Sequence, residues 1–95
     1  MKEKMKQALR HVREDAPLVQ CITNFVTVND CANMILASGG SPTMAEHPLE
    51  VQEAVRKAQA LVCNMGAIDK VDAMVLAGKE ANRLAIPVIL DPVGA

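Results

Sequence analysis

The sequence predicts an α/β fold in which helices cover a parallel sheet, and three observations support this prediction. Short apolar runs alternate along the chain with segments whose apolar residues recur at helical spacing. The connections between these segments are short, which favours right-handed crossovers between parallel strands. The apolar residues are almost entirely aliphatic, with one phenylalanine and no tyrosine or tryptophan, a composition typical of strands buried on both faces.

The first part of the chain is expected to hold two helices with a strand between them. Apolar residues recur at helical spacing over residues 2–14, and Pro17 ends that helix because proline disfavours helical geometry in the residue before it. Residues 18–22 are mostly apolar and indicate a short buried strand. After a polar turn, a second helix is expected to begin near Thr27 and to stop at Gly39-Gly40, since glycine readily adopts the left-handed conformation that ends helices.

The second part is expected to add three strands and two helices. A brief strand at residues 41–45 runs into a loop, and His47-Pro48 opens the next helix. Strands follow at residues 60–65 and 87–91, separated by a helix of about four turns that Asp69 can cap. The inner stripe of that helix is expected to consist of Val71, Met74, Val75, Gly78 and Ala81.

Charge and composition argue against several classes of protein. The formal net charge is −1 and no basic cluster follows the first helix, so neither nucleic acid nor an anionic membrane is an expected partner. No apolar stretch reaches the roughly 18 residues of a membrane span, and no signal peptide fits the charged start. Cys21, Cys31 and Cys63 lie in apolar runs without zinc-like spacing. They indicate buried thiols in a reducing, cytoplasmic compartment.

Residues suited to ligand contact follow each expected strand. In open parallel sheets, ligands bind beyond the carboxyl ends of the strands. These ends carry Thr23-Asn24, Met44, Asn64-Met65-Gly66 and Asp91-Pro92-Val93-Gly94. Asparagine supplies donors and an acceptor, and glycine allows close approach of the backbone, but the same residue types also form ordinary turns. Both interpretations stay open at this point.

Two of these residues and both histidines have specific alternatives. Met44 lies in a loop stiffened by Pro42, with no apolar stripe to join, so its thioether either plugs the core or meets a ligand. Asp91 can hold a divalent cation or cap a following helix. His47 can contact a ligand beside the Met44 loop, whereas His11 lies on a charged helix, and neither has a partner at metal-ligand spacing. The sequence contains no glycine-rich nucleotide loop of the Walker or Rossmann type and no defensible Ser/His/Asp order.

In order and spacing, the segments after the first helix resemble the N-terminal part of the hydroxyethylthiazole kinase family, thiamine-salvage enzymes of the ribokinase-like superfamily. The matching stretches are residues 17–19, 22–24, 29, 32–33, 37–45, 60–66, 77–82 and 87–95. Together the I-T-N, S-P-x-M and D-P-V-G-A elements are specific, although each alone is weak. The resemblance implies a three-layer ribokinase-like fold with a parallel sheet. Residues 1–95 would form about four βα units, the N-terminal part of a single kinase domain.

The resemblance also implies a reaction and a set of contacts. ATP would phosphorylate the hydroxyl group of 4-methyl-5-(2-hydroxyethyl)thiazole with the help of Mg²⁺, in a homotrimer whose thiazole sites lie at subunit interfaces. Met44 would pack against the thiazole ring and Asn24 would make a polar contact nearby, roles that suit a polarisable thioether and a carboxamide. Asp91 would lie near the metal and the phosphates.

The sequence also departs from the family pattern. Asn64-Met65-Gly66-Ala67 stands where the family usually has N-I-G-T. The family's nucleotide contacts, glycine-rich anion hole and catalytic cysteine lie in a later segment, so no catalytic residue is assigned here and residues 1–95 alone are expected to be inactive. The chain stops at Ala95, directly after a strand, which indicates an incomplete domain. The alternatives are a noncatalytic fragment or split-gene product, and a related kinase for another small alcohol; the loop at residues 41–44 argues against the latter.

Overall fold

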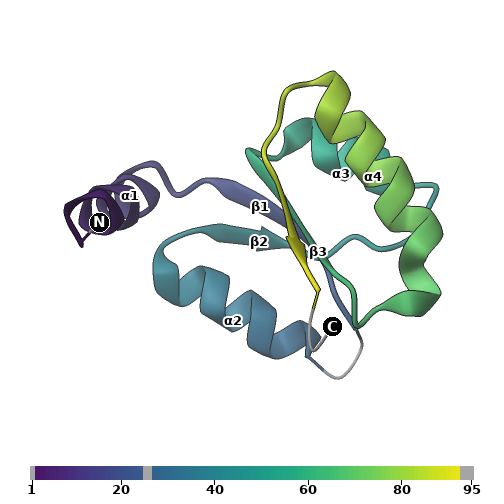
Figure 1. Cartoon of the computed structure of the whole chain (residues 1–95), viewed down its shortest axis with the longest axis horizontal. Helices are drawn as coiled ribbons and strands as arrows, with labels where there is room; N and C mark the ends of the chain where they lie inside the picture. Colours follow the sequence, from purple (N-terminus) through teal and green to yellow (C-terminus); the bar gives the residue numbers. More distant parts are fainter. Residues whose placement is uncertain (1, 25–26, 93–95) are drawn as a thin grey trace.

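A computed structural model describes residues 2–24 and 27–92 of the chain and places four strands in one parallel sheet (Figure 1). The order across the sheet is β2-β1-β3-β4, and every adjacent pair is parallel. The strands are β1 at Leu18–Ile22, β2 at Ser41–Thr43, β3 at Ala60–Asn64 and β4 at Val88–Asp91. The expected parallel α/β architecture is therefore confirmed, including the brief strand after the two glycines.

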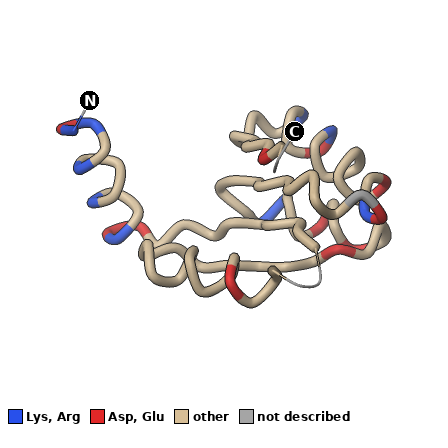
Figure 2. Tube along the Cα trace, turned by 60° about the horizontal axis from the view of Figure 1, so that its bottom comes forward, with Lys and Arg blue, Asp and Glu red and all other residues tan. Residues whose placement is uncertain are grey.

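Helices lie on both faces of this sheet. They are α1 at Lys2–Asp15, α2 at Val28–Ser38, α3 at Val51–Lys57, the short 3₁₀ helix η1 at Ile68–Lys70 and α4 at Val71–Arg83. Helices α3 and α4 pack against each other on one face, whereas α2 lies against β1 and β2 on the other (Figure 1). Helix α1 projects from one end of the molecule. Figure 2 shows basic residues along this helix and acidic residues at its two ends, a mixture of charges expected for a solvated helix.

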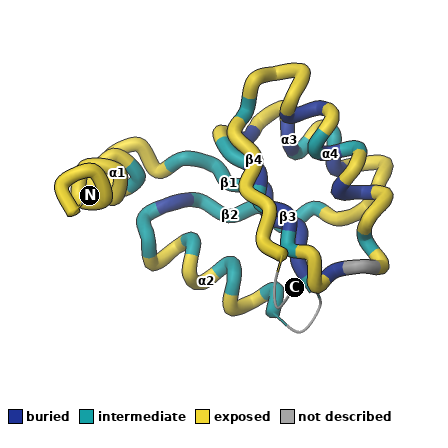
Figure 3. The backbone as a smooth tube through the Cα atoms, viewed as in Figure 1, coloured by how far each residue is buried: buried dark blue, intermediate teal, exposed yellow. Residues whose placement is uncertain are grey.

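The hydrophobic core lies between the sheet and the α3–α4 layer. Ile22 of β1 and Leu61 of β3 point to this side and are fully buried. Val51 and Val55 of α3 meet them from the helical layer, together with the alanines of α4. Figure 3 shows the buried segments gathered along β1, β3 and the facing sides of these two helices. Aliphatic side chains that alternate along strands and recur along helices thus form one core.

Several expected boundaries are correct. Helix α2 begins directly after Thr27 and ends at Gly39, whose φ of 102° is left-handed. Gly39 N–H donates to the carbonyl oxygen of Leu36 and Gly40 N–H to that of Ile35, which satisfies the last carbonyls of the helix. A Cβ at position 39 would also lie 2.9 Å from the Arg13 backbone. Glycine is therefore required here by both conformation and space.

Two expected helix starts are wrong. His47-Pro48 does not open α3: the carbonyl oxygen of His47 accepts hydrogen bonds from Glu50 N and Val51 N in a turn, and the helix begins at Val51. Asp69 does not cap α4, because it lies inside η1 and Lys70 precedes the helix. In both places a tight turn comes before the helix, and hydrophobic spacing does not distinguish such a turn from a first helical turn.

The expected inner stripe of α4 is only partly correct. Met74 and Ala81 are buried as expected, but Val71 and Val75 are exposed. The helix instead turns Ala73, Ala77 and Glu80 inward. Its small alanines allow the close approach of α3, so packing between the two helices sets the rotation of α4. Apolar periodicity alone would have favoured the larger valines.

Candidate functional site

The carboxyl ends of all four parallel strands lie at one edge of the sheet. Four short segments follow the strands there, at residues 23–24, 44–47, 65–67 and 92. Ile22 is level with Cys63, and Asn64 with Asp91, so the ends of β1, β3 and β4 are aligned across the sheet. The sequence prediction that ligand-type residues gather at this edge agrees with the topology.

The loop that carries Met44 is held on two sides. Gln20, in the middle of β1, is fully buried and donates a hydrogen bond through Nε2 to the carbonyl oxygen of Ala45. Lys70 of η1 donates through Nζ to the carbonyl oxygen of Thr23 at 2.8 Å and forms an ion pair with Glu46. These contacts bind the Met44 loop to the end of β1 and to the helix after β3. Met44 itself is half-buried.

Asn24 uses its side-chain oxygen within the turn into α2. Its Oδ1 accepts hydrogen bonds from Thr27 N and Thr27 Oγ1, both at 3.0 Å. The hydroxyl groups of Thr23 and Thr27 lie 2.9 Å apart, and Cys31 Sγ lies 3.7 Å from Thr23 Oγ1. Asn24 Oδ1 therefore has a structural role in this turn, and the substrate contact of Asn24 stays a prediction.

The ends of β3 and β4 are joined by backbone contacts. Asn64 Oδ1 accepts a hydrogen bond from Gly66 N at 2.8 Å, and Ala67 N donates to the carbonyl oxygen of Asn64 at 3.1 Å, which closes a tight turn. Met65 N donates to the carbonyl oxygen of Asp91 at 2.8 Å. The departure from the family pattern at residues 64–67 thus preserves an ordinary Asx turn. Residues 93–95 of the D-P-V-G-A element lie outside the described part of the chain.

Asp91 ends β4 and is exposed; it lies at the same carboxyl edge as the Met44 loop, but β4 and β2 are the outermost strands on opposite sides of the sheet. Within residues 2–24 and 27–92, no group of three or more His, Cys, Asp or Glu side chains is placed to hold a metal ion. A single carboxylate suits Mg²⁺, which keeps several waters and often takes its remaining ligands from substrate phosphates. Asp91 therefore fits the predicted role, and that role stays a prediction.

The buried cysteines are chemically quiet. Burial raises the pKa of the Cys21 thiol to about 12, with a further contribution from neighbouring Cys31. Burial also raises the pKa of Cys63. Since the thiolate is the nucleophile, neither buried thiol is primed for catalysis near neutral pH. All three cysteines are free. The expectation of buried thiols is correct for Cys21 and Cys63 and wrong for Cys31, which is half-buried.

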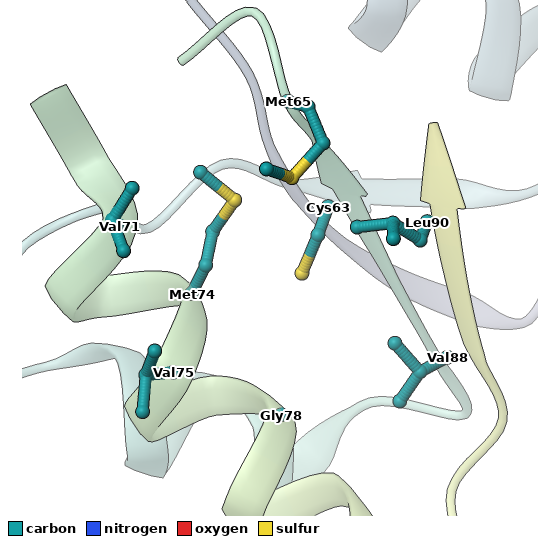
Figure 4. Close-up of a pocket in the computed structure, with 8 residues that line it drawn as sticks. All are labelled: Cys63, Met65, Val71, Met74, Val75, Gly78, Val88 and Leu90. Atoms are coloured by element: carbon teal, nitrogen blue, oxygen red, sulfur yellow. The ribbon is translucent and has the colours of Figure 1, made fainter. Parts of the chain in front are cut away.

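An apolar groove of about 320 Å³ lies between α4 and the β3–β4 pair (Figure 4). Its lining consists of Cys63, Met65, Val71, Met74, Val75, Gly78, Val88 and Leu90. The two methionines come from the position after β3 and from α4, and in Figure 4 both side chains lie toward the same end of the groove. Among the residues that the structure describes, no charged or hydrogen-bonding side chain other than a thiol lines this groove, and these residues offer nothing that would bind phosphate. Among the described residues, no helix is long and apolar enough to cross a membrane.

The parallel sheet with helices on both faces places the chain in the class of open α/β proteins, in which ligands bind beyond the carboxyl ends of the strands. The chain belongs to the hydroxyethylthiazole kinase family, whose model matches residues 9–95. The hydroxyethylthiazole kinase of Alkaliphilus metalliredigens is 53% identical over an alignment of 94 positions that covers 97% of this chain and 35% of that protein. The hydroxyethylthiazole kinase of Exiguobacterium sibiricum is 60% identical over 89 aligned positions. That alignment covers 92% of this chain and 35% of that protein.

A solved structure gives the same result. The hydroxyethylthiazole kinase structure from Pyrococcus horikoshii OT3 matches with a TM-score of 0.90 and 47% sequence identity. The match covers 98% of this chain and 37% of that one. The chain thus spans about a third of the length of the relatives it matches. The ribokinase-like α/β fold class and the family resemblance are both confirmed.

Proposed function

We propose that these residues form the thiazole-binding part of a hydroxyethylthiazole kinase. Such an enzyme transfers a phosphoryl group from ATP to the hydroxyl group of 4-methyl-5-(2-hydroxyethyl)thiazole in thiamine synthesis. The observation that carries the proposal is family membership over residues 9–95, together with a TM-score of 0.90 to a solved member. A cytoplasmic homotrimer with thiazole sites at its subunit interfaces belongs to the same proposal.

Met44 is the residue proposed to contact the thiazole ring. It lies at the carboxyl edge, half-buried, in a loop held by two polar contacts. A thioether on a fixed backbone offers a polarisable surface to a flat sulfur heterocycle. The Nδ2 group of Asn24 would donate to the polar edge of the substrate.

The nucleotide phosphates are proposed to bind at the end of β4, on the side of the carboxyl edge away from Met44. Asp91 would help to hold Mg²⁺, which neutralises charge on the nucleotide phosphates when it is bound. The carboxylate would hold the ion in place while the Met44 loop orients the hydroxyl group that accepts the phosphoryl group. Positioning and electrostatic stabilisation account for most of the catalysis in such transfers.

The test uses a full-length kinase in which residues 1–95 are joined in frame to the remaining two-thirds of the Alkaliphilus metalliredigens relative. We expect ADP formation that depends on Mg²⁺ and on the thiazole alcohol. A polypeptide of residues 1–95 alone, checked for length by mass spectrometry, should give none. Turnover of the chimera with other small alcohols but not with the thiazole would overturn the substrate assignment.

Met44→Ala is the sharpest substitution in this chimera. We expect the thiazole KM to rise roughly 10- to 200-fold, the cost of losing most of one apolar contact, while the ATP KM stays nearly unchanged. Met34→Ala is the control, because Met34 is an exposed methionine of α2 that lies away from the carboxyl edge, and it should leave both KM values unchanged. An unchanged thiazole KM in Met44→Ala, with a lower Tm, would identify Met44 as a core residue instead.

A further inference from the structure

Gln20 is an unusual residue for the centre of a parallel strand. Its side chain is fully buried and lies on the same face of the sheet as Ile22 and Leu61, which belong to the apolar core. A buried carboxamide is unfavourable unless its polar atoms are hydrogen-bonded. Nε2 donates to the carbonyl oxygen of Ala45, but within the described residues Oε1 has no hydrogen-bond partner. The position therefore keeps a polar group that an aliphatic residue would avoid.

Lys70 reaches the same loop from the opposite direction. Its side chain is only 13% exposed, although η1, from which it extends, lies at the surface. Nζ donates to the carbonyl oxygen of Thr23, the residue directly after β1, and pairs with the Glu46 carboxylate. One ammonium group thus connects the ends of two strands. Most lysines keep this group in water, so its burial here indicates a specific task.

The two contacts fix the backbone on both sides of Met44. Thr43 pairs with Gln20 in the sheet, Ala45 accepts the hydrogen bond from the Gln20 side chain, and Glu46 pairs with Lys70. Met44 is the residue between these fixed points. A long, flexible side chain loses less freedom on binding when its backbone is already held in place.

We propose that Gln20 and Lys70 are positioning residues that hold the loop at residues 44–46 and so present Met44 to the ligand. The proposal rests on the proposed function for the identity of that ligand. Neither residue contacts the reacting atoms in this assignment. Both act through the loop, Gln20 from inside the core and Lys70 from the surface.

Gln20→Leu separates positioning from stability. The substitution removes a buried polar group whose Oε1 has no partner among the described residues, which is favourable, but it leaves the Ala45 carbonyl oxygen without its donor, which is unfavourable. We expect these two effects to offset each other, so that the Tm changes little. In the full-length chimera we expect the thiazole KM to rise about 10- to 100-fold, the scale of effect for a misplaced contact, with a nearly unchanged ATP KM.

Lys70→Met tests the outer contact, because methionine keeps the apolar stem and removes the charge. We expect a smaller rise in thiazole KM than for Gln20→Leu, and Glu46→Gln should reproduce part of it. Lys57→Met is the matched control: Lys57 pairs with Glu53 at 3.6 Å on the exposed surface of α3, where both side chains are about 70% exposed. This control should leave both KM values unchanged.

Amide hydrogen exchange of residues 44–46 measures how firmly the backbone of this loop is held, and the measurement needs no substrate. Faster exchange there in Gln20→Leu, with core exchange unchanged, supports the positioning role even if the unsubstituted chimera neither binds nor turns over the thiazole. In that case the proposed function fails and the loop assignment stands. Unchanged loop exchange, or equal increases of both KM values, would overturn the positioning role.

Discussion

Strands β3 and β4 are neighbours of similar aliphatic character, yet they differ sharply in burial. Leu61 of β3 is fully buried, whereas Leu90 of β4 is 60% exposed and every residue of β4 is exposed. The cause is their surroundings: β3 lies between β1 and β4 beneath the α3–α4 layer, while β4 pairs with β3 alone in the described sheet. The comparison shows that an apolar run predicts a strand, but that its neighbours determine how much it stabilises the fold.

The largest effect on stability is expected from a leucine-to-alanine substitution in β3, compared with the same substitution in β4. Leu61→Ala should lower the free energy of unfolding by about 2–5 kcal/mol, because it removes buried methyl groups and leaves a cavity. Leu90→Ala should cost much less, since its side chain already contacts solvent. Urea unfolding of both variants, followed by circular dichroism, measures the difference. Equal losses would show that β4 is as buried in solution as β3, and the comparison would fail.

The same contrast explains what the sequence could predict. Residues 18–22, 60–65 and 87–91 were predicted as parallel strands from their aliphatic runs and from the helices between them, and local patterns suffice for that. The rotation of α4 was not predictable, because it depends on how alanines on α4 pack against α3. Such a contact joins two segments whose spacing patterns carry no information about each other.

The candidate site also contains some residues that the sequence could predict and others that it could not. Met44 and Asn24 were identified by their place after strands, and the structure puts both at the carboxyl edge. Gln20 and Lys70 were missed. Gln20 did leave a signal, since it is the one polar residue inside the run at residues 18–22, but Lys70 looks like any surface lysine in the sequence. Only the fold brings its ammonium group to Thr23 and Glu46.

A smaller effect on stability is expected at Glu80, a charged residue on the buried face of α4. Its carboxylate is almost fully buried, accepts a hydrogen bond from Arg83 Nε at 2.9 Å and lies 3.5 Å from Arg56 Nε. The hydrogen bond from Arg83 lowers the pKa of Glu80 below its ordinary value of 4.5, against the opposing effect of burial. The unfolded chain therefore binds this proton more readily than the folded chain.

Glu80 should thus stabilise the fold above about pH 4.5, and this contribution should be lost as the pH falls through the lower pKa of the folded state. Glu80→Gln is expected to lower the urea midpoint at pH 7 and to flatten its dependence on pH in the acid range. Glu53→Gln is the control, since Glu53 is exposed on α3. A urea midpoint that falls equally with acid in Glu80→Gln and in the unsubstituted chain would contradict this assignment.

The smallest effect, and the only stabilising one, is expected at Gly78, on the side of α4 that borders the apolar groove beside β4. This glycine lies inside α4 on the wall of the apolar groove, and no described atom lies within 4 Å of the position that a Cβ would take (Figure 4). Glycine is unfavourable within a helix, so Gly78→Ala should raise the free energy of unfolding by about 0.5–1 kcal/mol. Gly40→Ala is the control, because its Cβ would lie 3.1 Å from Ile35 Cγ2 and should bring no gain. The same Gly78→Ala change in the full-length chimera tests whether the exposed region around β4 stays exposed in the larger protein. If the gain persists there, the groove wall beside Gly78 is open in the larger protein as well, whereas a loss would show that another segment packs closely against this glycine.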